Sequence, residues 1–369
     1  MRCKLFFAIM WFIAIIAVFP GCSQKAADAD SDTLLPGIRT GNFVEGKTNL
    51  SDIIGEYSVI PLETTEESLI GGFSIKTIKK DGHFFVKSNN EVLMFDETGK
   101  FQCKLSRVGG GPEEYESISD FDIVPEYGEI WVSGNKRISR YKYPSMEYNG
   151  HIALDFFASQ FKYLGSDTFI ADTPEEVVYK IVSIDGKVLQ EFYDKDLANS
   201  ASFPVQFVET GCYVATQLGD SNSAVCYDSK TSSFSIKDIL PPENDHLATT
   251  EINRKYFDMY GYFDFNDKVL QDYATVGWFR RHGDQALVAM KYPGEQGMEQ
   301  AVIFKDGERV NEYIVWPEDK SMVRDDIFGS SSTRFLVTFG SCESDDSFIF
   351  IVADEDDDAN PSLLEVRKL

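Results

Sequence analysis

The side chains best suited to binding chemistry lie in a short stretch rich in tyrosine. Aromatic faces stack on the C–H faces of sugar rings, and carboxylates accept hydrogen bonds from sugar hydroxyl groups. Both residue types alternate here, as Tyr256, Asp258, Tyr260, Tyr262 and Asp264. The stretch therefore suits a sugar ligand, with the three tyrosines as a stacking platform. Aromatic side chains that fill space inside the fold would give the same pattern, and we favour that structural explanation.

A second polar group surrounds the glycine triplet at residues 109–111. Glycine-rich loops can cradle phosphate, but neither Lys-Ser nor Lys-Thr follows, and no helix-forming run begins here. We therefore favour a tight crossing between two repeats, where glycine permits a close approach of the backbone. The alternative is that Arg107, Glu114 and Tyr115 contact a ligand at one face of the fold.

No pattern in the sequence is typical of a catalytic or metal centre. Neither His-Glu-x-x-His, Gly-x-Ser-x-Gly nor Cys-x-x-Cys occurs. The acidic run at residues 354–358 lacks the glycine-broken spacing of a calcium loop. The four histidines are isolated, at His83, His151, His246 and His282. We therefore expect no metal, no cofactor and no catalytic residue.

Two cysteines are candidates for a disulfide. Cys212 and Cys226 lie at equal distances on either side of Gly219. In an antiparallel hairpin with its turn at that glycine they would face each other, with Cα atoms as close as about 4.5 Å, at the short end of the range that a disulfide spans. The alternative is a pair of small buried residues with free thiols.

The N-terminus has the layout of a secretory signal. Arg2 and Lys4 precede an apolar run over residues 5–19. That run is too short to span a bilayer comfortably, which takes about 20 residues. The cysteine that follows the run, Cys22, resembles the lipid-modified cysteine of bacterial lipoproteins. We predict a signal peptide over residues 1–21 and a lipid on Cys22; an uncleaved anchor or a free Cys22 is the alternative.

Composition limits the partners. The net charge of −25 repels nucleic acid phosphate and anionic lipid headgroups, so we exclude nucleic-acid binding and expect membrane attachment through the lipid alone. Residues 22–52 are polar and acidic, with no apolar period before Ile53. They are therefore expected to form the lipidated cysteine and a flexible tether.

From residue 57 onward, short alternating strands are separated by Gly, Asp and Asn turns. Each recurring strand is followed by a strand–turn–strand unit, with Asp-Gly turns at residues 185–186 and 306–307. About six such repeats predict an all-β fold, a β-propeller with six blades of four antiparallel strands over residues 53–369; seven blades or a two-sheet sandwich are the alternatives. An aromatic-rich insertion near 241–273 lengthens the spacing between two successive recurring strands, those that begin at residues 212 and 286. The recurring strands begin at residues 83, 129, 168, 212, 286 and 334.

Three segments carry a resemblance to a known family. Residues 57–71 and 107–115 resemble the six-bladed β-propeller lipoproteins of anaerobic Gram-negative bacteria, and residues 263–273 are similar to a later strand pair of that family. The resemblance covers nearly the whole mature chain. It implies a propeller fold, export and lipidation, and it supplies no catalytic residues.

These observations predict a non-catalytic binding module in the cell envelope, held at the outer membrane by its lipid and facing either the periplasm or the outside. Its partner would be a glycan, a peptide or an envelope protein. The alternative is a glycan-active hydrolase or lyase with its site at the propeller axis. Carboxylates, histidines or a metal converging near the axis would favour the enzyme, and a broad patch without perturbed titrating groups would favour the binding module.

Overall fold

The computed structural model describes residues 33–38, 48–49, 54–71, 76–173, 179–192, 208–210, 213–217, 222–241, 246–261, 265–294, 297–307, 309–315, 323–324, 335–337, 341–353 and 359–369. Cys22, the signal segment, Cys212 and Tyr262 lie outside these residues. No helix among the described residues has the length and apolar character needed to cross a membrane.

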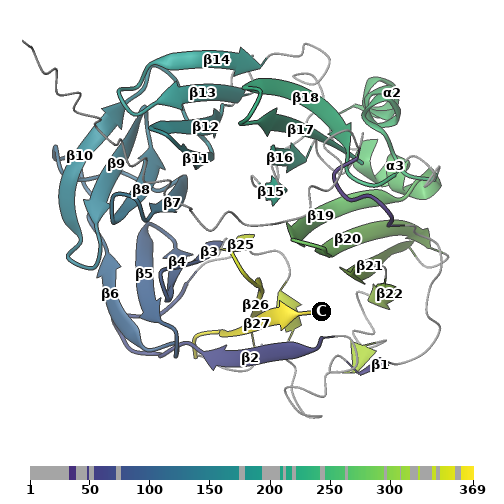
Figure 1. Ribbon diagram of the computed structural model, residues 1–369, viewed down its shortest axis with the longest axis horizontal. Coiled ribbons are helices and arrows are strands. Elements are labelled where there is room, and N and C mark those ends of the chain that lie inside the picture. The colour runs from purple at the N-terminus through teal and green to yellow at the C-terminus, as the bar shows by residue number, and fades with distance from the viewer. Residues whose placement is uncertain are drawn as a thin grey trace, which may run out of the picture. The chain divides into compact units, whose positions relative to one another are not determined.

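The described chain from residue 33 onward is a β-propeller, in which sheets stand side by side around a central axis (Figure 1). Sheet A contains β3 (Lys76–Lys80), β4 (His83–Ser88), β5 (Glu91–Asp96) and β6 (Phe101–Leu105). Sheet B contains β7 (Asp120–Val124), β8 (Glu129–Gly134), β9 (Arg137–Lys142) and β10 (Glu147–Ala153). Sheet C contains β11 (Phe161–Gly165), β12 (Thr168–Asp172), β13 (Tyr179–Ser183) and β14 (Val188–Phe192).

The second half of the chain repeats the pattern. Sheet D contains β15 (Val208–Thr210), β16 (Tyr213–Gln217), β17 (Ser223–Asp228) and β18 (Ser233–Asp238). Sheet E contains β19 (Thr275–His282), β20 (Gln285–Gly294), β21 (Gly297–Asp306) and β22 (Arg309–Val315). Sheet F combines β24 (Phe335–Val337), β26 (Phe348–Ala353) and β27 (Ser362–Lys368) with β2 (Glu56–Pro61) from the start of the propeller.

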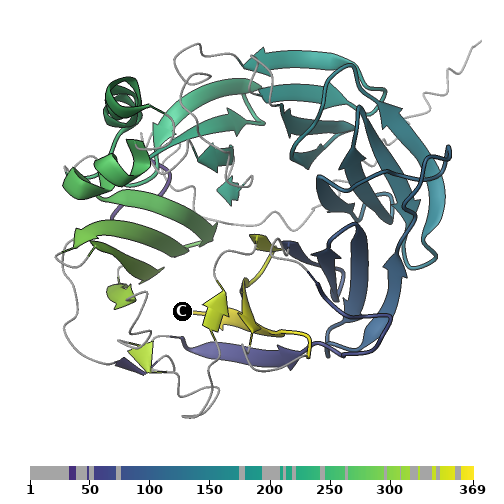
Figure 2. The same ribbon diagram turned by 180° about the vertical axis from the view of Figure 1, so that it is seen from behind.

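The two ends of the propeller chain meet in sheet F. Strand β2 pairs antiparallel with β27, from Glu56 opposite Lys368 to Pro61 opposite Ser362. Figure 2 shows these strands, purple and yellow, side by side from behind. Joining the first strand to the last closes the ring, so that every sheet has a neighbour on which to bury its apolar faces.

Buried apolar side chains fill the spaces between neighbouring sheets. Between sheets A and B, Phe85 and Met94 pack in one cluster with Ile123 and Ile130. The next cluster lies between sheets B and C and is built around Trp131, which is fully buried. Alternating strand residues supply the two faces of each sheet, which is why the predicted strands are apolar and aromatic.

Two hairpin glycines allow their sheets, A and C, to contact the preceding sheet closely. Gly99, between β5 and β6, has φ of +84°, and a Cβ there would lie 2.2 Å from the Pro61 carbonyl oxygen. Gly186, between β13 and β14, has φ of +85°, and a Cβ would lie 2.2 Å from the carbonyl oxygen of Ala153. Both positions need glycine for the turn and for the close approach.

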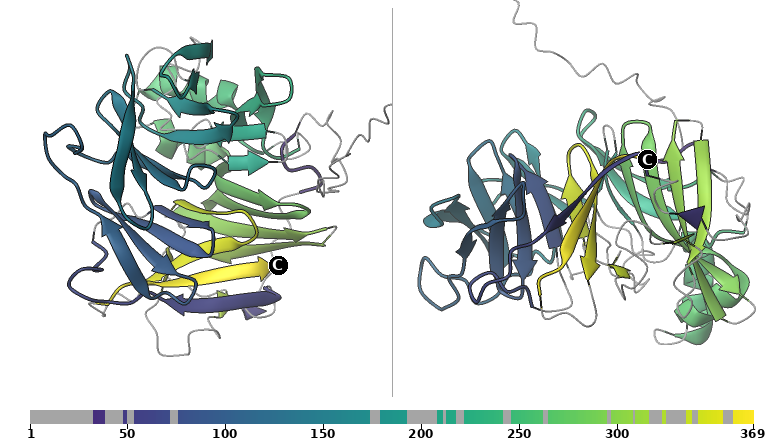
Figure 3. Two further views of the ribbon diagram at one scale, coloured as in Figure 1. Left: turned by 60° about the vertical axis from the view of Figure 1, so that its left-hand side comes forward. Right: turned by 90° about the horizontal axis from the view of Figure 1, so that it is seen from below.

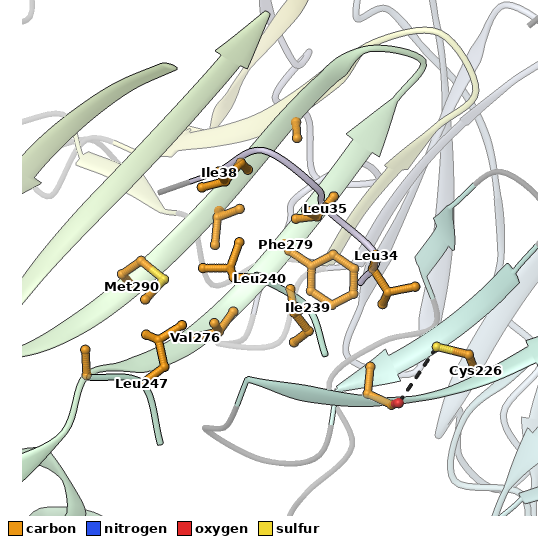
Figure 4. Packing of buried hydrophobic residues seen from close by; sticks show 14 residues of the cluster. Leu34, Leu35, Ile38, Cys226, Ile239, Leu240, Leu247, Val276, Phe279 and Met290 are labelled. Atoms are coloured by element: carbon orange, nitrogen blue, oxygen red, sulfur yellow. Dashed lines mark hydrogen bonds between the residues drawn. The ribbon is translucent and has the colours of Figure 1, made fainter. Parts of the chain in front are cut away.

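Residues 33–38 differ from the flexible tether that we predicted over residues 22–52. Leu34, Leu35 and Ile38 are buried in the cluster between sheets D and E (Figure 4). The Leu34 and Leu35 amides donate to the carbonyls of Asp238 and Ile239, both at 2.9 Å. A short parallel pairing of β1 (Thr48–Asn49) with β23 (Val323–Arg324) follows. Three apolar side chains in a polar run are enough to bind this segment to the fold, and we call residues 33–38 the strap.

The insertion near 241–273 contains two helices, α2 (Thr250–Tyr260) and α3 (Phe265–Asp272), where the sequence predicted a loop or a degenerate blade. They lie beside sheet E at the periphery of the ring (Figures 1 and 3). The Thr249 hydroxyl accepts a hydrogen bond from the Ile252 amide at 3.2 Å, which caps the first helix. Ala248 and Val269 form the small apolar contact between the insertion's segments.

Candidate functional sites

Buried charged side chains gather where the innermost strands approach the axis. Strands β3, β7 and β11 contribute Lys76, Asp120, Asp122 and Lys162, whose side chains are at most 10% exposed. Strand β25 (Ser341–Ser344) contributes Glu343. We call these five residues the axial cluster.

The two aspartates of the axial cluster join sheet B to sheet C. Asp120 and Asp122 alternate on β7 and so project from the same face. The Asp120 carboxylate accepts the Phe161 amide of β11 at 3.0 Å, and the Asp122 carboxylate accepts the Tyr163 amide at 2.8 Å. These bonds satisfy backbone donors at the free inner edge of sheet C.

Glu343 links strand β25 to sheets A and C. Its carboxylate lies 2.7 Å from the Lys162 ammonium and 3.4 Å from that of Lys76. Strand β25 itself pairs parallel with β3, with Glu343 opposite Ile78. Burial alone would raise the pKa of the Glu343 carboxyl, but the two ammonium groups hold it well below its ordinary value.

The other charges of the axial cluster compensate one another. Burial would lower the pKa of Lys76, but Asp120 and Glu343 keep it above the ordinary value. Burial raises the pKa of Asp122 despite the attraction of Lys162. The Lys76 ammonium also donates to the Phe121 carbonyl at 2.9 Å. Oppositely charged groups thus satisfy each other in a region that excludes water.

Asp172, at the end of β12, is a further buried carboxyl with a perturbed pKa. Its side chain is buried, and burial raises the pKa of its carboxyl to about 7. Among the described residues its Oδ1 atom has no hydrogen-bond partner, and the same holds for Oε1 of Gln160. A carboxyl in this position is partly protonated near neutral pH.

The axial region therefore has the converging carboxylates and perturbed pKa values that we associated with an enzyme. Three of these carboxylates, however, are already bonded to ammonium groups or backbone amides. Within the described residues no group of three His, Cys, Asp or Glu side chains could hold a metal ion. The visible role of the axial cluster is to bind sheets A, B and C and strand β25 together.

A cavity of about 450 Å³ lies beside the glycine triplet, between sheet A and sheet B. It holds two of the predicted ligand-contact residues, Arg107 and Glu114. The complete lining is Lys104, Ser106, Arg107, Val108, Glu114 and Met146. We call it the Arg107 cavity.

Tyr115, the third predicted residue, supports the Arg107 cavity from behind. Its ring is buried, its hydroxyl donates to the Asn90 carbonyl at 2.9 Å, and its amide donates to the Arg107 carbonyl at 3.0 Å. The same hydroxyl accepts the Arg107 amide at 3.2 Å. Burial raises the pKa of Tyr115 to about 12. Tyr115 thus fixes the loop and is not exposed to a ligand.

Glu114 explains the glycine triplet. Its carboxylate accepts the Gly111 amide at 2.8 Å. A Cβ at Gly109 would lie 2.0 Å from this carboxylate, so the first glycine of the triplet leaves room for it. The loop is therefore the predicted tight crossing between two sheets, and it also forms one wall of the cavity.

Of the two described tyrosines of helix α2, Tyr256 packs against neighbouring side chains and Tyr260 is exposed. The Tyr256 ring lies 6.1 Å from that of Tyr273, and its hydroxyl donates to Asp272, so it packs between the helices. Tyr260 is 42% exposed and lies 5.8 Å from Tyr256. Tyr256 and Tyr260 lie on helix α2, whereas the residues of the Arg107 cavity belong to sheets A and B and the loop between them. Tyr262 lies outside the described residues, so a stacking platform that includes it remains a prediction.

The hairpin register differs from the one that placed Cys212 opposite Cys226. Cys226 on β17 is a free, buried thiol, and its neighbour on β16 is Ala215. Burial raises the pKa of the Cys226 thiol to about 12. Tyr213 already pairs with Asp228, so the hairpin is shifted relative to our symmetric prediction.

Sequence reasoning missed the axial cluster, although a signal was present. Lys76, Asp120 and Lys162 each lie in the strand that precedes one of the recurring strands, at or next to its first residue. Examining the first strand of each repeat for charged residues would have identified them. Glu343 could not have been found in this way, because its strand pairs with β3 from the other end of the chain.

Residues 39–240 match the profile of a family described as a domain of unknown function, DUF4934. The fold is similar to that of a candidate exported protein (BF0058) from Bacteroides fragilis NCTC 9343, with 14% identity, a TM-score of 0.65 and coverage of 91% of this chain and 99% of that one. A DUF4221 member from Bacteroides vulgatus ATCC 8482 follows, with 10% identity, a TM-score of 0.48 and coverage of 85% and 96%. No curated protein matches the sequence.

Proposed function

We propose that this chain, which belongs to the DUF4934 family, is an exported, lipid-anchored β-propeller that binds its ligand without transforming it. The family description assigns no activity, so the proposal depends on the chain's own residues. Sheets A to F would be the six blades of the propeller: sheets B to F have four strands each, and sheet A has four strands to which β25 is added as a fifth.

Two observations support export and lipidation. The basic start, the apolar run over residues 5–19 and Cys22 have the order of a lipoprotein signal. The similar Bacteroides fragilis structure is that of a candidate exported protein. In this proposal the lipid on Cys22 holds the propeller at the outer membrane, and the polar residues up to the strap separate it from the bilayer.

The Arg107 cavity carries the binding proposal. Its volume of about 450 Å³ is within the usual range for small-molecule sites. Its walls are fixed in advance by Tyr115 and by the hydrogen bond that the Gly111 amide donates to the Glu114 carboxylate. A pre-organised site loses little conformational entropy when a ligand binds, which is what a binding module requires.

The experiment for this function has two parts. Full-length chain and its Cys22→Ser variant are compared by membrane fractionation, and we expect only the variant to appear in the soluble fraction. The detergent-purified chain is then applied to glycan and peptide arrays, and captured ligands are re-examined by mass spectrometry. We expect capture that is lost in Arg107→Gln, with every ligand recovered intact. Unchanged fractionation would reject the lipid anchor, and capture that survives Arg107→Gln would reject the cavity.

The alternative, a glycan-active hydrolase or lyase at the axis, is favoured by one observation, the raised pKa of Asp172. A carboxyl with a pKa near 7 can serve as a general acid. Incubation of the same glycans with the chain distinguishes the two functions. Shortened products that disappear in Asp172→Asn would establish the enzyme and reject the binding module.

A further inference from the structure

The lining of the Arg107 cavity indicates the polarity of its ligand. Lys104, Ser106, Arg107 and Glu114 are polar, and only Val108 and Met146 are apolar. Sites for small molecules are usually lined by apolar and aromatic side chains with few polar groups. A cavity with this opposite balance suits a compact ligand that carries many hydroxyl groups and little apolar surface.

Two cations, Arg107 and Lys104, line the cavity. The Arg107 guanidinium is oriented by its Nε, which donates to the Met146 carbonyl at 3.1 Å. Its Nη1 lies 3.9 Å from Glu113, whose side chain is 63% exposed. Lys104 lies 3.4 Å from Glu91, and both side chains are about 30% exposed. Exposed pairs of this kind contribute only about 0–1 kcal/mol, so a ligand carboxylate can compete for both cations.

The guanidinium fork also favours a carboxylate over a neutral group. Arginine binds a carboxylate through two parallel N–H···O bonds, which are stronger than bonds between neutral partners. The chain as a whole carries a net charge of −25, and Glu91, Glu113 and Glu114 stand beside the two cations. An anionic ligand must therefore take the place of Glu91 and Glu113 at Lys104 and Arg107, and added salt should weaken its binding.

Glu114 supplies a hydrogen-bond acceptor, whereas Arg107 and Lys104 supply donors. One oxygen, Oε2, accepts the Gly111 amide at 2.8 Å, which fixes the carboxylate in the cavity wall. The second oxygen can accept a hydroxyl group of the ligand. Val108, which is 52% exposed, and Met146 offer apolar contact for ring C–H groups.

We propose that the Arg107 cavity binds a hexuronic acid residue of an acidic glycan. Arg107 and Lys104 hold the ring carboxylate, Glu114 accepts a ring hydroxyl, and Val108 and Met146 contact the apolar ring face. This inference rests on the proposed function, because it names the ligand of the same cavity. The carboxyl end of a peptide would offer the same anion, but its side chain would need an apolar wall, and the cavity has two apolar residues only.

The test is calorimetric titration of the detergent-purified full chain with short oligomers of galacturonate, glucuronate and mannuronate. The matching neutral oligomers of galactose, glucose and mannose have the same rings without the carboxylate. We expect at least one acidic oligomer to bind at least tenfold more tightly than its neutral counterpart, with an affinity that decreases as salt increases.

Three variants make the titration specific. Arg107→Gln and Lys104→Gln should each weaken the acidic oligomer about tenfold or more, which is the loss of one charge-assisted contact. Lys142→Gln is the matched control, since Lys142 is exposed on β9 and does not line the cavity. Melting temperatures of all three variants show whether any loss of affinity comes from unfolding. Arg107→Gln removes the hydrogen bond to the Met146 carbonyl, but Lys104→Gln leaves it in place. Lys104→Gln therefore tests the cavity even if Arg107→Gln destabilises the loop.

The outcomes separate this inference from the proposed function. Equal binding of acidic and neutral oligomers, or capture of free peptide carboxylates alone, would overturn the hexuronate proposal while leaving a ligand in the cavity. Absence of any ligand whose binding depends on Arg107 would overturn both. Acidic binding that Lys142→Gln weakens as much as Arg107→Gln would also overturn the proposal, because it would reflect surface charge alone.

Discussion

The Glu343 carboxylate on β25 lies 2.7 Å from the ammonium of Lys162 on β11, and this pair joins segments that are far apart in the chain. Strand β25 lies between two strands of sheet F in the sequence, yet it pairs with β3 of sheet A. Through Lys162 it is also bound to sheet C. One carboxylate thus connects the last part of the propeller to two of its earlier sheets.

Replacing Glu343 by Gln should strongly destabilise the propeller. The substitution leaves two largely buried ammonium groups, Lys76 and Lys162, without their shared anion, and breaking a buried pair from one side costs about 3–5 kcal/mol. Urea unfolding of the two proteins measures the difference in the free energy of unfolding. Glu113→Gln, at an exposed carboxylate, is the control and should stay within about 0.5 kcal/mol. A similarly small effect at Glu343 would show that the axial pairs contribute little.

Asp172→Asn should change how stability depends on pH. The pKa of Asp172 is raised to about 7 in the folded chain, above the value of 3.8 for a free carboxyl. The folded state therefore holds the proton more tightly, and the stability gained in acid is lost as pH rises towards and through 7. The amide cannot ionise, so the variant should escape this loss, by about 2–4 kcal/mol above pH 8.

Melting temperatures at pH 5 and pH 8.5 provide the measurement for Asp172. The variant should gain more on the wild type at pH 8.5 than at pH 5, because most of the loss falls between these two values, while Asp155→Asn, at an exposed position, should change neither melting temperature. Equal shifts of Asp172→Asn at both pH values would mean that ionisation at this site does not limit stability.

Local patterns in the sequence account for most of the strands, and long-range contacts account for the errors. Five recurring strands, beginning at residues 83, 129, 168, 212 and 286, correspond within one residue to the second strand of sheets A to E. The sixth, at 334, overlaps β24, which is the first strand of sheet F, since the true second strand is β26. Alternation identifies a strand, but only pairing with neighbours defines its position in a sheet.

The difference between local patterns and long-range contacts also explains which site residues could be predicted from the sequence. Arg107 and Glu114 were found because glycine triplets are local signals, and the cavity between them depends on Met146 from the next sheet. The strap was missed because three apolar residues in a polar run, Leu34, Leu35 and Ile38, have no period. Their burial depends on a cluster of residues from Ala224 onward, more than 180 positions away along the chain.

The strap should contribute to stability as a core segment does. Leu34 is 2% exposed, and emptying a buried leucine site costs about 2–5 kcal/mol. We expect Leu34→Ala to lower the free energy of unfolding by this amount and to expose the strap to limited proteolysis. Leu69→Ala is the control, because Leu69 is 54% exposed. Resistance to protease equal to that of the wild type would indicate that the strap is not bound in solution.

The two described tyrosines of α2 should respond differently to truncation. Tyr256 packs against Tyr273 and donates its hydroxyl to Asp272, so Tyr256→Ala should lower the free energy of unfolding by about 1–3 kcal/mol, less than the cost of emptying a fully buried aromatic site. Tyr260 is 42% exposed, and its loss should leave stability within about 0.5 kcal/mol. Chemical denaturation of both variants provides the comparison. If Tyr260→Ala leaves the fold intact but weakens capture on the glycan arrays, the exposed end of α2 takes part in recognition. If capture is unchanged, the insertion is structural, and the Arg107 cavity alone accounts for binding.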